Sequence, residues 1–598
     1  MFLLWGKHIN KYYLKYLIFF LVGLASLITV DWFQLELPEV LGSIVQYLKD
    51  HGTIDLTSPF FHDTMIHVIY LAFILLGGRV LWRLSLLFAS KKIEAHMRHE
   101  IYLKAEALDV TYYHSHKIGN IMSWATNDLD TLEEFLGWGT LMMVDGIFLT
   151  SFAIVKMFVL TPSLGLISLL PIALIALVGA LCSGAMSNRW RLRQEANDAL
   201  YDFSQESFTG IRVIKAFVKE KQQIHEFRKI AKKSKDFDVK FVFVSTLFDV
   251  LIEIVIAVIV SIILGFGGWF VYAAITGNPV VIFDRPIIIQ PGELVTFIGY
   301  FFSLIWPMIA LGQVVTGFSK ARASYHRIAN FLDVPIDIVD SESAIDVDIK
   351  GNISFNHFSF TYPNTSKEVL HDITLEIKRG QQIGIVGTIG SGKTTLVNSL
   401  LHLYNINPHQ VFIDGADISE IKVACLRGGV AIAPQDNFLF AGSILDNVAL
   451  TDEEYDLDKV NKACDDADIS KDIKDFKDGV NTLIAEGGVT VSGGQKQRIS
   501  LARAIFKDSP ILILDDVVSA VDIKTEENIL HNIKENRADK TTLIVASRVS
   551  TVMHMDKIIV LNKGRLEAFD TPQNLLKCSE TFKTMSLLQQ FSVKKGDK

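Results

Sequence analysis

The sequence predicts two domains of different class: an all-α membrane domain with six spanning helices, followed by an α/β domain with a phosphate-binding loop. Three observations predict this. Long apolar runs fill residues 1–320, a glycine-rich loop at 387–394 follows a short apolar run, and Leu512-Ile513-Leu514 ends in the paired carboxylates Asp515 and Asp516. Apolar runs of this length are typical of membrane helices, and a glycine-rich loop with such an acid pair is typical of a phosphate-binding site.

Length and composition support this division. A chain of 598 residues is too long for one core, so several domains are expected. The formal net charge of −8 is mild for this size and gives no reason to expect nucleic acid as a partner. The cysteines are far apart and form no CxxC pair, so neither a disulfide framework nor a zinc site is supported: Cys182, Cys425, Cys464 and Cys578.

Six segments of the first half are long and apolar enough to cross a bilayer, which takes about 20 residues. The first follows a few lysines and is followed by acidic residues rather than a cleavage site of small residues, so it is expected to be a retained helix and not a signal peptide. The expected spans are 14–33, 64–88, 136–160, 163–187, 243–275 and 291–318.

The basic residues of the connections predict the orientation of these helices. The connections 89–135 and 189–240 are rich in Lys and Arg, whereas 34–63, 161–163 and 276–290 carry few. Because cytoplasmic loops carry the excess of basic residues, both basic connections and both chain termini are expected in the cytoplasm, with the lipid bilayer of the plasma membrane around the spans.

Each basic connection contains one departure from an otherwise helical pattern. Both connections lack proline and keep helical spacing, so they are expected to continue the membrane helices into the cytoplasm. The departures, at 112–120 and 208–217, each contain a glycine where a turn could form. A short helix there could press on the soluble domain; ordinary loop chemistry is the alternative.

Three carboxylates lie inside or at the edge of the apolar spans: Asp145, Asp249 and Glu253. A charge at membrane depth is costly and usually faces a cavity or a partner. Asp249 and Glu253 are four residues apart, hence on one helix face, and could attract a cationic substrate. The alternative is that they pair with a basic side chain such as Lys156 or lie in water at the inner boundary.

The soluble half contains a loop suited to phosphate. Its glycines allow the backbone N–H groups to wrap phosphate oxygens, Lys393 adds charge at the β and γ phosphates, and the Thr394 hydroxyl can ligate Mg²⁺. The preceding residues 382–386 read as a buried strand. The residues expected to hold ATP here are Gly387, Thr388, Ile389, Gly390, Ser391, Gly392, Lys393, Thr394 and Thr395.

Further candidate residues lie on both sides of this loop. Tyr362 ends an alternating run and could stack on adenine, with a core or surface tyrosine as the alternative. Gln435 follows a strand and could reach Mg²⁺ and the attacking water. Asp515 is the expected Mg²⁺ ligand at the end of its strand.

A second phosphate cradle begins at Ser492, Gly493, Gly494 and Gln495. Serine and two glycines at the start of a helix leave free N–H groups at the positive end of its dipole. One chain can hardly use two cradles on one nucleotide. Each cradle is therefore expected to close on ATP that another subunit holds.

The ordered set of motifs resembles the nucleotide-binding domain of ABC transporters, and the six-span half resembles the exporter type. The motifs are Tyr362, the phosphate loop, Gln435, Ser492-Gly493-Gly494-Gln495, Asp515 and Ser519-Ala520-Val521-Asp522. The resemblance covers about residues 10–585. It implies a membrane domain at 1–320, a linker at 321–350 and a nucleotide domain at 351–598, with ATP and Mg²⁺ as cofactors, Asp522 at the nucleotide, and coupling helices at the two departures.

The chain differs from this family at two positions. Asp516 replaces the general-base glutamate, and Ser547 replaces the switch histidine. Aspartate is shorter than glutamate by roughly 1.3 Å of reach, and a general base must reach its water. A misplacement of about 1 Å can cost on the order of 10²-fold in rate. Serine has no imidazole to contact the γ phosphate, so the chain's own site is expected to bind ATP well and to hydrolyse it slowly.

The resulting hypothesis is one half of an ATP-driven multidrug exporter that works as a heterodimer with a second, non-identical half-transporter. The pattern resembles the degenerate-site subunit of bacterial heterodimeric multidrug exporters. Its substrates would be small amphipathic molecules, cations among them. The alternatives are a homodimer in which Asp516 and Ser547 are tolerated changes, a lipid or peptide exporter, and a nucleotide-gated regulator without transport.

Overall fold

The computed structural model describes residues 6–53, 57–282, 285–450, 455–485, 491–519 and 521–596. The chain divides into two compact units. The membrane unit comprises Met1–Ala105 with Gly119–Val334, and the nucleotide unit comprises Glu106–Ile118 with Pro335–Lys598. The membrane helix α13 continues to Leu332, so the first part of the predicted linker at 321–350 is helical.

The membrane unit consists of long helices and one short hairpin in the residues that the structure describes. An uninterrupted helix satisfies every backbone N–H and C=O internally, which lipid requires. Its helices are α1 (Lys7–Lys15), α2 (Leu17–Gln34), α3 (Glu36–His51), α4 (Pro59–Ala107), α10 (Pro162–Thr209), α11 (Ile211–Ala216), α12 (Glu220–Ile275) and α13 (Pro291–Leu332), and the hairpin is β1 (Val280–Ile282) with β2 (Arg285–Ile287).

The segment from Ile118 to Leu160 is one further span in which α-helical and π-helical turns alternate. Each π turn inserts a residue relative to the α-helix, a feature common at functional sites. Its parts are α6 (Ile118–Ser123), η1 (Trp124–Asp128), α7 (Leu129–Glu134), η2 (Phe135–Gly139), α8 (Thr140–Val144), η3 (Asp145–Leu149) and α9 (Thr150–Leu160).

Helices lie at all six positions where the sequence predicts spans. Five stretches of the described residues are long and apolar enough to cross a membrane: Leu17–His51, Pro59–Ala107, Ile118–Leu160, Glu220–Ile275 and Pro291–Leu332. The predicted fourth span at 163–187 falls within α10. Its side chains at 167–185 lie outside the described part of the chain.

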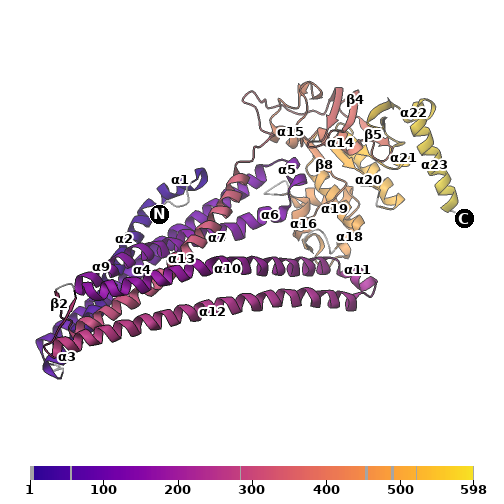
Figure 1. Ribbon diagram of the computed structural model, residues 1–598. Coiled ribbons are helices and arrows are strands. Elements are labelled where there is room, and N and C mark those ends of the chain that lie inside the picture. The colour runs from indigo at the N-terminus through magenta and orange to yellow at the C-terminus, as the bar shows by residue number, and fades with distance from the viewer. Residues whose placement is uncertain are drawn as a thin grey trace. The chain divides into compact units, whose positions relative to one another are not determined.

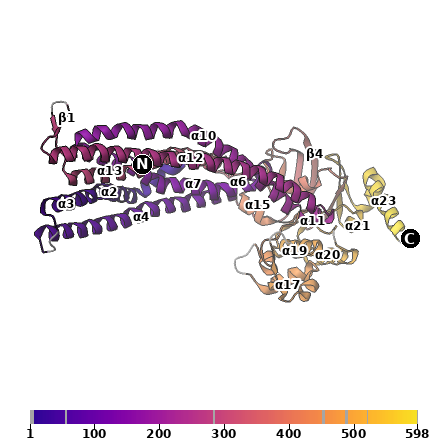
Figure 2. The same cartoon turned by 60° about the horizontal axis from the view of Figure 1, so that its bottom comes forward.

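The membrane helices pack around a core that draws on distant parts of the sequence. Helices α10 and α12 run side by side (Figure 1). Helix α13 lies next to α3 and α12 (Figure 2) and also contacts α9. The core cluster contains Leu149, Met157, Ile263, Phe297 and Phe301. Many apolar side chains point outward instead, such as Val159 at 80% exposure, as expected of helices that face lipid.

The nucleotide unit contains two sheets. A six-stranded sheet has the order β14-β13-β5-β12-β11-β8, parallel except for the β13–β14 pair, and a four-stranded antiparallel sheet has the order β4-β3-β6-β7. The strands are β3 (Ile353–Thr361), β4 (Glu368–Ile377), β5 (Gln382–Gly387), β6 (Val411–Ile413), β7 (Ala416–Asp417), β8 (Val430–Ala433), β11 (Ile511–Asp515), β12 (Thr541–Val545), β13 (Lys557–Asn562) and β14 (Arg565–Asp570), with the small pair β9 (Gly442–Ser443) and β10 (Leu483–Ile484).

The helices of this unit connect the strands and bury both faces of the parallel sheet. Strands β5 and β11 are buried at every position, which is typical of parallel strands covered on both sides. The helices are α5 (Val110–Ser115), α14 (Lys393–Ser399), α15 (Val423–Gly429), α16 (Ile444–Val448), α17 (Leu457–Asp466), α18 (Ser470–Asp475), η4 (Gly479–Asn481), α19 (Gly493–Phe506), α20 (Ile523–Asn536), α21 (Val549–Val552), α22 (Pro572–Cys578) and α23 (Glu580–Gly596).

The short helix α5 comes from the first basic connection but belongs to the nucleotide unit. The Asp109 side chain caps it by accepting a hydrogen bond from the Tyr112 backbone N–H. Val110 packs against the hydrophobic core that strands of both sheets share, and the centre of the His114 ring lies 6.3 Å from that of Tyr404. The predicted contact of the first departure with the soluble domain is therefore confirmed. The second departure forms the short helix α11, which belongs to the membrane unit.

Candidate functional site

The predicted phosphate loop joins the buried strand β5 to helix α14. Gly390 and Gly392 adopt φ of 76° and 91°, the left-handed region that favours glycine. The Lys393 ammonium donates to the carbonyl oxygens of Gly387 and Thr388, at 3.1 Å each. Burial lowers the pKa of Lys393, and the nearby carboxylates of Asp516 and Asp515 oppose that shift.

Thr394 and Asp515 meet at the carboxyl edge of the sheet. The Thr394 hydroxyl donates to Asp515 Oδ1 at 3.2 Å, and Asp515 is only 2% exposed. Burial raises the pKa of Asp515, the charge of Asp516 adds to that rise, and the Thr394 hydrogen bond and the Lys393 charge counteract it. A cation bound here would relieve the cost of burying this carboxylate.

Gln435 lies at the same edge of the sheet. Strand β8 pairs with β11 so that Ala433 stands opposite Leu514. Gln435 comes two residues after Ala433 and is exposed, and Asp515 comes directly after Leu514. Because Ala433 and Leu514 are paired, the predicted Mg²⁺ residues Gln435 and Asp515 lie at the same edge of the sheet.

The residues of the loop fit a nucleotide phosphate. Ser391 Oγ is buried and has no hydrogen-bond partner in the described part of the chain. A Cβ on Gly387 would lie 2.1 Å from the Leu561 carbonyl oxygen, so only glycine fits there. Mg²⁺ takes one or two protein ligands together with phosphates and water, and Thr394 and Asp515 could supply these ligands.

The two residues that differ from the family pattern contact one another. Ser547 Oγ donates to Asp516 Oδ1 at 3.2 Å. Asp516 adopts φ 53°, its N–H donates to the Val545 carbonyl at 3.0 Å, and its own carbonyl accepts from Gln497 Nε2 at 3.1 Å. The backbone of the short acid is therefore fixed, and its carboxylate is engaged by the residue that replaces the switch histidine.

Two further predicted residues have structural contacts of their own. The Tyr362 hydroxyl is 2.9 Å from Thr395 Oγ1, and its ring meets those of Phe360 and Tyr404 edge-to-face at 5.0 and 5.2 Å. The Asp522 side chain caps helix α20 by accepting from the Thr525 N–H at 3.1 Å. Stacking of Tyr362 on adenine and a nucleotide contact by Asp522 remain predictions.

The second cradle forms the start of helix α19. Ser492 and Gln495 make a reciprocal capping box, with distances of 3.3 and 3.0 Å. A Cβ added to Gly493 would meet nothing within 4 Å. Sequence reasoning missed one residue that holds this helix start. Asp472 accepts a hydrogen bond from Gln495 Nε2 at 2.9 Å and pairs with Arg498 at 2.9 Å. Asp472 lies 23 residues before Gln495, so the motif itself gave no sign of it.

Comparisons with known proteins agree with this architecture. The family model "ABC transporter transmembrane region" matches residues 19–308, and the model "ABC transporter" matches residues 370–519. The chain is 30% identical over 593 residues to the probable multidrug resistance ABC transporter ATP-binding/permease protein YheI of Bacillus subtilis, covering 99% of this chain and 98% of that protein. The chain belongs to the ABC transporter family. It is an exporter-type half-transporter, with a transmembrane region fused to one ATP-binding domain.

Matches to other proteins also cover nearly the whole length of the half-transporter. The multidrug resistance-like ATP-binding protein MdlA of Escherichia coli is 29% identical over 579 residues, 97% of this chain and 95% of that protein. The solved structure of a bacterial Atm1-family ABC exporter with ATP bound shares the fold. Its TM-score is 0.76 at 21% identity, and the match covers 97% of this chain and 98% of that chain. Membership of the family makes the half-transporter a multi-pass membrane protein whose transport is coupled to ATP.

The structure separates the three predicted membrane carboxylates. Asp145 is 8% exposed and accepts a hydrogen bond from Trp306 Nε1 at 3.0 Å. Asp249 and Glu253 are both exposed on α12. The alternative that Lys156 pairs with them is wrong, because the Lys156 ammonium lies 2.6 Å from Glu39 Oε1 instead. Sequence reasoning placed Glu39 in the connection 34–63, outside the expected spans, and gave it no partner.

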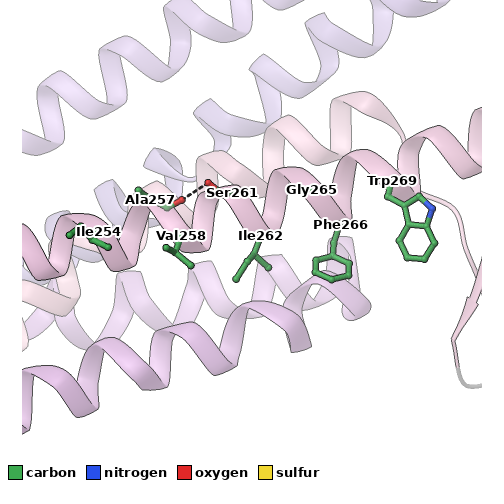
Figure 3. Close-up of a pocket in the computed structure, with 8 residues that line it drawn as sticks. All are labelled: Ile254, Ala257, Val258, Ser261, Ile262, Gly265, Phe266 and Trp269. Carbon is green, nitrogen blue, oxygen red and sulfur yellow. Dashed lines mark hydrogen bonds between the residues drawn. The ribbon is translucent and has the colours of Figure 1, made fainter.

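Beyond Glu253, the next turns of α12 line a shallow apolar pocket. Figure 3 shows its side chains along one side of the helix, from Ile254 to Trp269. The Ser261 hydroxyl donates a hydrogen bond to the Ala257 carbonyl oxygen at 2.8 Å, so it adds little polarity to the pocket.

Proposed function

We propose that this half-transporter is the degenerate-site subunit of a heterodimeric multidrug exporter. Its own site, built from Lys393, Thr394 and Asp515, binds ATP and Mg²⁺ and hydrolyses ATP slowly. Its Ser492–Gln495 cradle completes the catalytic site of a second, non-identical half-transporter.

The observation that carries this proposal is the 3.2 Å hydrogen bond from Ser547 Oγ to Asp516 Oδ1. A general base must accept a proton from water in the transition state. The Asp516 carboxylate already accepts a hydrogen bond from Ser547, so one of its oxygens is engaged, and its side chain is shorter than that of glutamate. With serine at 547, no imidazole supports the γ phosphate. Both differences act on the hydrolysis step and leave the phosphate and metal residues in place.

The second cradle is intact, which favours a role for it at another subunit's nucleotide. The capping box, Asp472 and Arg498 hold the first turn of α19 in one conformation. A preorganised helix start of this kind can stabilise the charge of a phosphate without rearrangement. ATP would then clamp two nucleotide domains together, and the clamp would drive the membrane halves from inward-facing to outward-facing.

Relatives named for multidrug resistance support export of small amphipathic molecules. The exposed Asp249 and Glu253 and the apolar pocket next to them on α12 would favour cations among these substrates. The excess of Lys and Arg in the two long connections supports an orientation with both termini in the cytoplasm of a cell whose plasma membrane holds the exporter.

The test is ATP hydrolysis by the full-length half-transporter, alone and co-purified with a similar half that carries glutamate and histidine at the two deviating positions. We expect ATP binding in both samples and rapid hydrolysis only in the pair. Lys393→Ala serves as the control that removes nucleotide binding from this chain. Rapid hydrolysis and transport by a symmetric pair of this chain alone would refute the proposal and favour the homodimer.

A further inference from the structure

The C-terminal helix α23 holds the segment that carries Ser547. This segment, 546–550 (the switch segment), follows strand β12 and leads into α21. Gln589 of α23 makes two hydrogen bonds to its backbone. Its Nε2 donates to the Ser547 carbonyl oxygen at 3.0 Å, and its Oε1 accepts from the Val549 N–H at 2.7 Å. One side chain therefore fixes the backbone on both sides of Arg548.

Gln589 stands on the face of α23 that packs against the domain. Phe582, Met585 and Gln589 follow one another at spacings of three and four residues, so they share one face of the helix. Phe582 is fully buried, and Met585 packs against the same hydrophobic core. An apolar side chain at position 589 would gain more from burial. A glutamine there points to a role for its amide group.

The bond to Val549 satisfies a group that α21 leaves open. The first N–H groups of a helix have no partner within that helix. Arg548, the residue before α21, directs its side chain to Glu526 and to the Ser519 carbonyl oxygen, at 3.3 Å each, and makes no capping hydrogen bond with the described residues. Gln589 supplies the acceptor from another helix. Val549 is only 3% exposed, so water is a poor substitute.

Packing does not hold the switch segment on the side of α20. A cavity of about 1090 Å³ lies there, lined by Arg548, Ser550 and Gln589 together with residues of α20 such as Glu527 and Lys534. Open space beside a segment allows it to shift when its hydrogen bonds are lost. The two bonds from Gln589 therefore restrict a movement that the surrounding side chains leave possible.

We propose that Gln589 is a positioning residue for ATP hydrolysis: α23, through Gln589, holds the switch segment so that residue 547 faces Asp516. The Ser547 hydroxyl contacts Asp516 at 3.2 Å, and Gln589 holds the backbone that carries this hydroxyl. Both bonds from Gln589 go to backbone atoms, so they do not depend on which side chain occupies position 547. The role therefore applies to a heterodimer and to a homodimer alike.

The first test measures amide hydrogen exchange by mass spectrometry in the full-length chain in lipid nanodiscs, without nucleotide. Gln589→Met keeps the length of the side chain and removes both hydrogen bonds. We expect exchange at 546–552 to become faster on the order of tenfold, because these bonds keep the segment closed. Exchange in β11 and β12 should not change. Lys583→Met, at an exposed position of the same helix, is the matched control.

The second test separates ATP binding from ATP hydrolysis. It uses the chain with Asp516→Glu and Ser547→His, whose own site is expected to turn over. Adding Gln589→Met should lower kcat on the order of tenfold, because residue 547 loses its position. The KM for ATP should stay within about twofold, because Lys393 and the phosphate loop are unchanged. If the double variant is inactive, that failure concerns the proposed function, and the exchange measurement decides the role of Gln589.

Unchanged exchange at 546–552 in Gln589→Met, or faster exchange confined to α23, would overturn the proposal and show that Gln589 only anchors the C-terminal helix. An equal rise in Lys583→Met would also overturn it. So would an unchanged kcat in a variant whose switch segment exchanges faster. If Gln589→Met does not fold, Gln589→Glu takes its place. It keeps the acceptor for the Val549 N–H and loses the donor to the Ser547 carbonyl, so a smaller rise in exchange is expected.

Discussion

Replacing Asp516 by glutamate and Ser547 by histidine together is expected to raise ATP hydrolysis by this chain on the order of 10²-fold, since a reactive group misplaced by about 1 Å can cost that much. Glutamate adds one methylene, roughly 1.3 Å of reach. Replacing Ser547 by histidine removes the hydrogen bond that the Ser547 hydroxyl donates to Asp516 Oδ1. A 10²-fold gain corresponds to about 2.7 kcal/mol of activation free energy.

The assay is steady-state ATP hydrolysis by the dimeric fraction of the full-length protein in nanodiscs. Two copies of the double variant would contain complete Ser492–Gln495 cradles and restored bases, so no partner is required. Each single variant is expected to gain little, because one defect remains in each. Lys393→Ala in the double-variant background gives the baseline rate.

The substitution has a structural cost that can be measured separately. Residue 516 has φ 53°, and the left-handed region costs a non-glycine residue about 1 kcal/mol, with Asp among the residues that tolerate it best. Asp516→Glu should therefore lower the free energy of unfolding by up to that amount. Full activity from Asp516→Glu alone, or none from the double variant when it is folded, dimeric and able to bind ATP, would refute the reasoning.

Three further outcomes are expected. Gly494→Trp should lower ATP hydrolysis by the complex with the partner subunit on the order of 10²-fold, because a bulky side chain obstructs the start of α19. ATP binding to this chain should persist. Unchanged turnover would count against a role for the Ser492–Gln495 cradle. Tyr404→Leu should lower the free energy of unfolding of the nucleotide unit by about 2 kcal/mol in thermal unfolding, since its ring contacts to Tyr362 and His114 are lost, and Tyr404→Phe should cost much less. In maleimide labelling at neutral pH, Cys578 should react and Cys464 should not, because Cys578 is exposed whereas burial raises the pKa of the Cys464 thiol to about 12; rapid labelling of Cys464 in the folded protein would contradict its burial.

Much of the nucleotide site could be predicted because its chemistry is local. The phosphate loop needs glycines, a lysine and a hydroxyl within a few residues, and these are adjacent in the chain. The long apolar spans are local for the same reason, since a helix in lipid satisfies its backbone within itself. Asp516 and Ser547 could be identified as departures because the ordered motifs resemble a known family, whose pattern has glutamate and histidine at these positions.

The contact between Asp516 and Ser547 required the tertiary structure. Strands β11 and β12 are neighbours in the sheet, and their register sets Asp515 opposite Val545. The residues that follow both strands therefore meet at the same edge. The sequence shows that two residues are unusual, but only strand pairing shows that one donates a hydrogen bond to the other.

The carboxylates of the membrane unit also show that the sequence does not reveal which side chains are in contact. Hydropathy located Asp145, Asp249 and Glu253 in the spans, but it gave no means of telling a buried carboxylate from an exposed one, and it passed over Asp31. Burial and pairing depend on which helix faces meet, and residues far apart in the chain, such as Glu39 and Lys156, decide them. The sequence by itself therefore determined the class of transporter and the chemistry at each motif, because both depend on residues that are close together in the chain. Only the tertiary structure decided which charges are paired, because packing brings distant side chains together.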